Sequence, residues 1–398
     1  MKTLVTGGTG VVGANLIRAL LAAGRDVRAL VRRGPAPRAL LGLPIESVEG
    51  DVLDPASLAR AAAGVDVVFH AAARFTYRGV GANELDRVAV DGTRHMIEAA
   101  ANAGVRRVVL TSSSVIFGSS PRPAARDESA TLTREDASTY AMSKVRQTTA
   151  AFATAREIGI ETVAVCPALT IGGWDYRLAE SNAALVKYLN DPFRTTFTGG
   201  CNIVSAADVA RGHILVAERG TPGQMYLVGG ENADWREVHA EISTLCGTYG
   251  PLATASHVGA YLAAAWGEVM ARGTGIPASL TRDEVRMMGR WYWYDDGRAR
   301  ALGYQPSSMR DALREALIWL LRTEHIRADV RAAIQMAGRF AEAVTGEAVS
   351  SPSTGPTTSE APFEARASGS ASSGSTRSGS TSPGSSRRTQ PVPPLDPA

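Results

Sequence analysis

The stretch VTGGTGVVGANL, residues 5–16, decides the fold of this 398-residue chain. It places glycines at G-x-x-G-x-x-G spacing directly after an apolar run and at the start of a helical pattern. A Cβ in such a turn would keep the backbone away from a pyrophosphate, and a helix N-terminus supplies free N–H donors. Set between a strand and a helix, the stretch predicts a dinucleotide-binding loop made of Gly7, Thr9, Gly10, Val11, Val12 and Gly13.

Short apolar runs alternate with longer helical patterns over the first 168 residues. Continuous Val, Leu and Ile runs indicate strands buried on both faces, and strands separated by helices pair in parallel. We therefore expect an α/β fold with a doubly wound parallel sheet. The expected strands are 2–6, 26–31, 44–50, 66–72, 106–114 and 161–168, and the expected helices are 11–23, 55–63, 84–103 and 138–158.

Three regions follow from this pattern. Residues 1–167 form the dinucleotide-binding domain, to which segments around 200–228 return. Residues 168–345 form a smaller mixed lobe that binds substrate, in which RWYWYDD (290–296) alternates bulky side chains like a strand. Residues 346–398 are rich in Ser, Gly and Pro, and we expect a disordered tail because so little apolar surface cannot offset the entropy of ordering.

The composition of the chain limits which partners it can bind and which compartment suits it. The net charge is only +3, and no polybasic run is present, which argues against nucleic acid. Strand-like residues begin directly after Met1 and no run of 18 apolar residues occurs, so we expect neither a signal peptide nor membrane insertion. Cys166, Cys201 and Cys246 are too widely spaced for a disulfide framework or a metal site. A cytoplasmic protein without a metal fits best, with His70 a packed histidine.

The residues after the second expected strand bear on the choice of cofactor. In NAD-binding sheets this strand is usually followed by an acidic residue that accepts hydrogen bonds from the ribose hydroxyls. Here Arg32 and Arg33 follow the strand instead. A guanidinium can form paired hydrogen bonds with a 2′-phosphate, and this favours NADP(H) over NAD(H) as the cofactor. The alternative is a pair of solvated loop arginines in an arginine-rich chain. Asp51, after the third strand, could accept from the adenine amino group.

A tyrosine and a scarce lysine stand four residues apart in STYAMSK, residues 138–144. The chain has only three lysines, which makes a chance pairing of Tyr140 with Lys144 improbable. Residues at i and i+4 share one helix face. A neighbouring cation and a nearby oxidised nicotinamide both favour phenolate over phenol, so we expect them to lower the pKa of Tyr140 from its usual value of about 10.

In all, the chain resembles the extended short-chain dehydrogenase/reductase family over about residues 1–325. The resemblance rests on TGGTGVVG, GDVLD, FHAAA, VDGT, VVLTSSSVIFG, YAMSK and CPALTIGG, in the family's order. NIVSAADVARGHILVAERG and YLVGGEN look most like its dihydroflavonol-reductase-like branch, and the hopanoid-associated sugar epimerase-like proteins seem nearest of all.

This resemblance implies roles for individual residues. Tyr140 would be the acid/base, Lys144 its helper, and Ser113, five residues before Gly118, the hydroxyl that orients the substrate oxygen. We prefer Ser113 to Ser112 because alternation along the strand turns Ser112 away. The family also implies a homodimer through the helices carrying VDGT and YAMSK. Its cofactor-binding positions would include Asp51, Val52, Ala71, Ala72, Tyr140, Lys144 and Pro167.

The chain departs from the family pattern in three places. Ala89 replaces the Asn usual before V-x-G-T, which could loosen the backbone near the active site. Cys166 replaces an Arg, which weakens a nucleotide-sugar interpretation. Ser114 and Val115 stand where nucleotide-sugar dehydratases carry an acidic pair, so dehydration is disfavoured.

We therefore predict NAD(P)H-dependent reduction of a ketone or aldehyde on a small, ring-containing or lipid-like metabolite. The alternatives are an NAD-dependent sugar epimerase or hydroxysteroid-type dehydrogenase and, in another class, a non-catalytic NADP-binding regulator. The Tyr-Lys pair argues against the regulator. Aromatic side chains could line an apolar substrate pocket, with ordinary core packing as the alternative for each: Phe75, Tyr77, Phe117, Trp174 and Tyr176.

Overall fold

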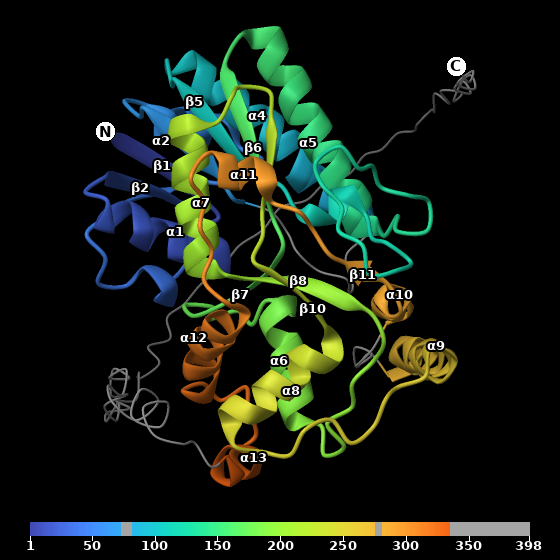
Figure 1. Cartoon of the computed structure of the whole chain (residues 1–398). Helices are drawn as coiled ribbons and strands as arrows, with labels where there is room; N and C mark the ends of the chain where they lie inside the picture. The colour runs from blue at the N-terminus through green and yellow to red at the C-terminus, as the bar shows by residue number, and fades with distance from the viewer. Residues whose placement is uncertain (73–81, 275–280, 335–398) are drawn as a thin grey trace, which may run out of the picture. The chain divides into compact units, whose positions relative to one another are not determined.

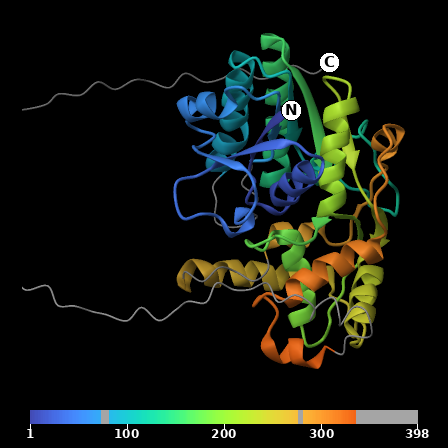
Figure 2. The same ribbon diagram turned by 90° about the vertical axis from the view of Figure 1, so that its left-hand side faces the viewer.

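The computed structural model describes residues 1–72, 82–274 and 281–334 (Figure 1). The tail predicted at 346–398 lies outside these residues, as do Phe75 and Tyr77. Two lobes make up the described part of the chain, and the second lies below the first in Figure 1 and Figure 2.

The first lobe is built on a seven-stranded sheet of order β3-β2-β1-β4-β5-β6-β9. Every neighbouring pair is parallel, which confirms the predicted doubly wound fold. Four expected strands are shorter in the structure, because their end residues belong to loops. The strands are β1 (Lys2–Thr6), β2 (Asp26–Val31), β3 (Glu46–Glu49), β4 (Val67–His70), β5 (Arg107–Thr111), β6 (Glu161–Pro167) and β9 (Met225–Val228).

Helices cover both faces of this sheet, which explains its continuous apolar strands. Leu4 and Val5 are adjacent on β1, yet they belong to two different buried clusters, one on each face. One face carries α1 (Val11–Ala22) and α7 (Ala206–Arg219), and the other carries α2 (Pro55–Ala62), α4 (Gly92–Asn102) and α5 (Thr139–Ile158). The predicted start of α2 is confirmed, since the Asp54 side chain accepts from the Ala56 N–H before Pro55 opens the helix.

The helix predicted at 84–103 is not uniform. It consists of α3 (Ala82–Asp86), a π-helical segment (Arg87–Asp91) and α4. Ala89, where the family pattern has Asn, is buried within the π-helical segment. A π-helical turn widens the helix locally and often occurs near functional sites.

The second lobe holds a smaller mixed sheet. Its strand β8 pairs in parallel with β7 and β11 and antiparallel with β10. The strand expected in RWYWYDD is confirmed as β11, although it is only two residues long. The strands are β7 (Leu169–Ile171), β8 (Gly200–Ser205), β10 (Glu231–Asp234) and β11 (Trp291–Tyr292). The segment 200–228 is therefore divided, because β8 lies in this sheet whereas α7 and β9 join the first.

Helices pack beside this sheet around a separate apolar core. That core includes Ile171 of β7, Val238 of α8 and Leu317 of α12, all fully buried. The helices of the lobe are α6 (Glu180–Asn190), α8 (Trp235–Cys246), α9 (His257–Thr274), α10 (Arg282–Met287), α12 (Met309–Leu321) and α13 (Ala328–Ala333). The short helix α11 (Gly297–Ala301) returns to β9 of the first lobe, where Ala299 joins the core. Over the described ranges, no helix combines the length and apolarity that a membrane span needs.

Candidate active site

Two glycines of the N-terminal loop are required by the protein's own packing. Gly7 has φ +73°, and a Cβ there would lie 2.5 Å from the carbonyl carbon of Ala71. A Cβ on Gly13 would lie 2.3 Å from the carbonyl oxygen of Gly7. Any larger residue at either position would force the backbone apart.

Gly10 is different, since its neighbours leave room for a side chain. The only atom near a Cβ at Gly10 would be the Gly7 carbonyl oxygen at 3.7 Å, an ordinary contact, and its φ of −88° suits any residue. Gly10 is the N-cap of α1, so a side chain there would stand over the free N–H groups of the helix. The loop therefore fits a pyrophosphate, which needs close approach to those groups.

Gly10→Ala is expected to lower dinucleotide affinity roughly tenfold or more, because the phosphate loses charged hydrogen bonds to the helix N-terminus. Its thermal unfolding should stay close to that of the wild type, because the added methyl group meets no bad contact. Gly13→Ala, in contrast, should destabilise the fold itself. Calorimetric titration with the dinucleotide, beside thermal unfolding, checks both variants. Unchanged affinity in Gly10→Ala would contradict the assignment of the loop.

A cleft of about 910 Å³ lies at the carboxyl ends of β1 to β4, a size typical of ligand sites. Seven of the predicted cofactor residues line it: Gly7, Thr9, Arg32, Arg33, Asp51, Val52 and Ala72. Gly10, Val11, Val12, Gly13, Ala71 and Pro167 belong to the neighbouring loop and strand ends and do not line it. The structure thus brings the two arginines and Asp51 into one cavity.

The wall of this cleft is basic on balance, since its arginines outnumber two acidic residues, Asp51 and Glu84. Besides Arg32 and Arg33, it includes Arg38, Arg87 and Arg177, which the sequence did not single out. Within the described ranges, none of these five arginines forms an ion pair with an acidic side chain. The cleft therefore suits a ligand with several negative charges.

Tyr140 lies in the first turn of α5, buried against the loop that follows β5. Burial raises the pKa of its phenol to about 12, and a hydrogen bond with Ser113 lowers it in part. The protein's own groups thus shift this pKa opposite to the predicted direction, because desolvation of the phenolate outweighs the favourable contacts. The effect of the nicotinamide stays a prediction. The hydrogen bond does bring together two of the three residues predicted for catalysis.

Lys144 is also buried, one turn along α5. Its Nζ donates to the Thr111 carbonyl oxygen (3.1 Å) and to Gln147 Oε1 (2.9 Å). Burial lowers the pKa of the ammonium to about 8. The ammonium thus donates to two neutral acceptors, one on β5 and one on its own helix.

A chain of buried hydrogen bonds continues from Lys144 to the glycine-loop strand. Gln147 Nε2 donates to Thr93 Oγ1 (3.0 Å), which also bonds His70 Nε2 (3.1 Å). His70 Nδ1 in turn bonds Thr6 Oγ1 at 2.8 Å. The interpretation of His70 as a packed histidine is confirmed. Sequence analysis missed the roles of Gln147 and Thr93, although Gln147 is three residues after Lys144 and shares its helix face.

Ser113 and Ser112 face different partners. Ser112 Oγ bonds Thr148 Oγ1 at 2.7 Å, on α5 and away from the phenol. Strand β5 ends at Thr111, so Ser113 is no longer a strand residue but caps the short 3₁₀ helix Ser114–Phe117. The choice of Ser113 thus agrees with the geometry, but the capping turn sets its direction and strand alternation does not.

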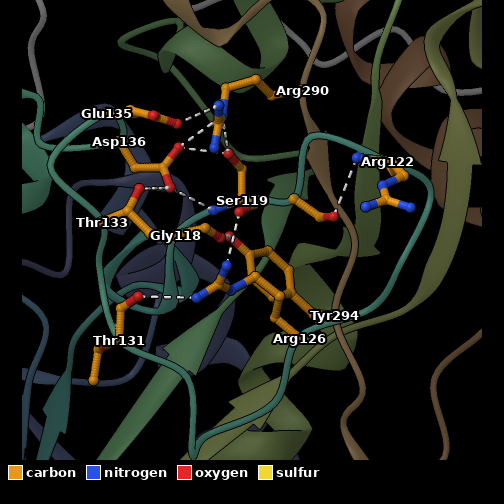
Figure 3. Close-up of polar contacts among 11 residues, drawn as sticks. Gly118, Ser119, Arg122, Arg126, Thr131, Thr133, Glu135, Asp136, Arg290 and Tyr294 are labelled. Atoms are coloured by element: carbon orange, nitrogen blue, oxygen red, sulfur yellow. Dashed lines mark hydrogen bonds and ion pairs between the residues drawn. The ribbon is translucent and has the colours of Figure 1, made fainter.

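The loop that leads into α5 is fastened to the second lobe by a buried ionic network (Figure 3). The Asp136 carboxylate accepts from the Ser119 N–H (3.0 Å) and from Thr133 Oγ1 (2.8 Å), and it pairs with Arg290 Nε at 3.0 Å. Arg290 directly precedes β11. The Asp136 carbonyl oxygen also accepts from the N–H of Ser138, the N-cap of α5. The network therefore fixes the start of the helix that presents Tyr140.

A second cavity, of about 320 Å³, opens beside this helix. Its lining comes from both lobes: Val115, Arg134, Glu135, Asp136, Ala137, Ser138, Ala141, Arg286, Met287 and Tyr292. Ser138 and Ala141 flank Tyr140 along the chain, and Val115 is two residues after Ser113. This position suits a substrate pocket.

None of the described aromatic residues predicted for a substrate pocket lines this cavity. Phe117 is 1% exposed and belongs to the core of the first lobe. Trp174 lies under the Arg18 guanidinium, 3.6 Å from its ring centroid, and Tyr176 lines the larger basic cleft. The core-packing alternative therefore describes Phe117. For Trp174 and Tyr176 a place in the substrate pocket stays a prediction, since the connection after β7 turns toward α1 and carries both with it.

Comparison with known proteins gives the family. Residues 3–229 match the model of the NAD dependent epimerase/dehydratase family. The match covers more than half of the chain, so the protein belongs to this family, and the resemblance to extended short-chain dehydrogenases/reductases is confirmed.

Relatives that match over nearly their whole length indicate the class of enzyme. Sterol demethylase protein B of Methylococcus capsulatus is 33% identical, over 80% of this chain and 98% of its own. The 4-hydroxy-2-methyl-3-oxo-4-farnesyl-3,4-dihydroquinoline-1-oxide ketoreductase of Stigmatella aurantiaca is 32% identical, over 79% and 96%. The crystal structure of gox2253 has a TM-score of 0.72 and 30% identity, over 82% of this chain and 99% of that one. The protein is an NAD(P)-dependent oxidoreductase of the extended short-chain type.

Proposed function

We propose that this enzyme reduces a ketone or aldehyde to an alcohol with NADPH, and that Tyr140 supplies the proton. One observation carries the proposal: the buried Tyr140 phenol is hydrogen-bonded to Ser113 and lies one helical turn from the buried ammonium of Lys144. Such a phenol is protonated at neutral pH, which is the form needed to protonate a substrate oxygen. Relatives named as a ketoreductase and a cinnamoyl-CoA reductase support the direction of reaction.

Each residue of the site would have its own role in the reduction. A nicotinamide dinucleotide, when bound, supplies the hydride that the carbonyl carbon accepts. The Ser113 hydroxyl donates a hydrogen bond to the carbonyl oxygen, and Tyr140 transfers its phenolic proton to that oxygen as negative charge develops there. Lys144 then stabilises the phenolate, held in place by Thr111 and Gln147. One hydride and one proton convert the carbonyl into the alcohol.

The cofactor is proposed to be NADP(H) because of the basic cleft. Arg32 and Arg33 line it directly after β2, where an acidic residue would otherwise receive the ribose hydroxyls. Within the described residues, neither arginine forms an ion pair. A 2′-phosphate would supply their negatively charged partner. The loop geometry at Gly10 suits the pyrophosphate of either dinucleotide, so the preference depends on the arginines.

Arg32→Asp is expected to lower the ratio of kcat/KM for NADPH over NADH by roughly 100-fold or more, because attraction to the 2′-phosphate becomes repulsion. The new carboxylate can also accept from the ribose hydroxyls of NADH. Arg156→Asp makes the same charge change at an exposed position near the end of α5 and should leave the ratio unaltered. Initial rates with both cofactors measure it, and an unchanged ratio in Arg32→Asp would remove the basis for the NADP preference.

The substrate is proposed to be a compact, ring-containing or lipid-like carbonyl compound. Val115, Met287 and Tyr292 give the smaller cavity apolar surface, while Glu135 and Arg286 add polar groups. Relatives named for sterol, steroid and farnesylated quinoline chemistry support this class of substrate.

One assay tests the proposed function. NADPH and NADH oxidation would be followed with a panel of quinones, flavanones, steroids and sugar nucleotides. Rapid NADPH oxidation with a ring-containing ketone supports the proposal. Conversion of a sugar nucleotide without net cofactor oxidation would identify an epimerase, and preferential use of NAD⁺ with a hydroxysteroid would identify a dehydrogenase. Tight NADP binding without turnover of any compound would indicate a regulator.

A further inference from the structure

The connection between β7 and α6 is attached to the first turns of α1. Asn15 Nδ2 donates to the Gly173 carbonyl oxygen (3.0 Å), and Arg18 stacks on the ring of Trp174. On its other side, Trp174 packs against Trp319 of α12 with ring centroids 5.3 Å apart. This connection is therefore a fixed bridge from the second lobe to the cofactor-binding lobe.

The backbone of the connection is held in an unusual conformation. Trp174 has φ 62° and Leu178 has φ 52°, both in the left-handed region that non-glycine residues rarely adopt. Such residues cost about 1–3 kcal/mol each and persist only where the surroundings fix them. Here Asp175, 1% exposed, accepts from the Ala179 N–H (2.6 Å) and from Asn182 Nδ2 (2.9 Å). Arg177 lies between the two left-handed residues and shares their fixed position.

Arg177 is placed in the same basic cleft as Arg32. Burial lowers the pKa of Arg177, and repulsion by Arg32 lowers it further, whereas Asp175 opposes the shift. The Asp175 carboxylate is already engaged by Ala179 and Asn182, and the described residues offer Arg177 no ion pair. Two guanidinium groups, one from each lobe, thus face one cavity, and an anion between them would relieve their repulsion.

We propose that Arg177 is a specificity-determining residue, which joins Arg32 in binding the 2′-phosphate of NADP(H). The inference rests on the proposed cofactor preference and extends it, because one arm of the phosphate site then comes from the second lobe. A guanidinium matches a phosphate in geometry as well as in charge. Recognition of the 2′-phosphate would accordingly depend on the bridge that Trp174 and Asp175 hold in place.

Two nucleotides that differ only in the phosphate provide the test: adenosine 2′,5′-bisphosphate and 5′-AMP, titrated calorimetrically into the full-length protein. In Arg177→Ala, affinity for the bisphosphate is expected to fall roughly tenfold or more through loss of charged hydrogen bonds. Affinity for 5′-AMP should stay nearly unchanged, which also shows that the site is folded. Arg106→Ala, at an exposed position beside the amino end of β5, should alter neither affinity.

The possible outcomes separate this inference from the cofactor preference. If the wild type favours the bisphosphate and Arg177→Ala keeps that discrimination, the role of Arg177 is overturned while the preference stands. If the variant loses affinity for both nucleotides equally, Arg177 is not a determinant of the 2′-phosphate. If the wild type binds both nucleotides equally, the NADP preference fails and this inference fails with it.

Discussion

Tyr140→Phe is expected to lower turnover by roughly 10²- to 10⁴-fold, the contribution usual for a positioned general acid. The substitution removes only the phenolic oxygen, so the ring stays packed in its buried position. Dinucleotide affinity should remain almost unchanged, since the cleft lined by Arg32 and Asp51 keeps all its groups. The loss should therefore appear in kcat, and steady-state rates beside cofactor titration measure it.

A second buried tyrosine provides the matched control. Tyr226 of β9 is 3% exposed, and its hydroxyl accepts from the Thr221 N–H at 2.8 Å. Tyr226→Phe also deletes a buried hydrogen-bonded hydroxyl and should lower stability by about 1 kcal/mol, yet it should leave turnover close to the wild-type value. Full activity in Tyr140→Phe, or equal losses in both variants, would show that the phenol of Tyr140 is not the proton donor.

Lys144→Met is expected to remove most of the activity and to change the pH dependence of stability. The wild-type ammonium is desolvated, with a pKa of about 8 against an ordinary value of 10.5. Because the folded pKa is depressed, the unfolded chain binds more protons between these values, and the free energy of unfolding rises with pH across that window. The shift corresponds to about 3 kcal/mol. Lys144→Met lacks this group, so its stability should not show the rise.

Urea unfolding between about pH 7 and pH 10.5 checks this, with the wild type and Lys144→Met measured side by side. The difference between their free energies of unfolding should change by about 3 kcal/mol over the range in favour of the wild type at high pH. Gln147→Ala removes a hydrogen-bond partner but keeps the lysine, so it should retain the rise. Parallel profiles for the wild type and Lys144→Met would contradict the buried, desolvated ammonium.

Much of the fold follows from local patterns in the sequence. The strand-glycine-helix order at residues 2–22 and the strands that are apolar on both faces predicted the parallel sheet correctly. The Asp54 cap was also predictable, because the Asp-Pro pair that marks the start of the helix is a local signal. Predictions that extended over longer patterns were less accurate. The helix at 84–103 contains a π-helical segment, and the strand through Ser112 and Ser113 ends at Thr111. The expected homodimer stays a prediction.

The candidate site was only partly predictable. Gly7, Arg32 and Asp51 were found because each follows a strand, and parallel strands end at one edge of the sheet. Arg177 gave no such signal, since it reaches the cleft from the second lobe through a connection with left-handed residues. The positions of Trp174 and Tyr176 depend on the same connection and were not predictable from local spacing.

By itself, the sequence determined the class of fold, the glycine loop and the Tyr140–Lys144 pair, because periodicity and i,i+4 spacing are local properties. Only the tertiary structure decided the environment of the pair: burial raises the pKa of the Tyr140 phenol, and the ammonium of Lys144 is held by Gln147 and Thr111. The physical reason is that a pKa in a protein depends on desolvation and on partners brought together from distant parts of the chain. The same holds for the basic cleft, whose arginines come from both lobes.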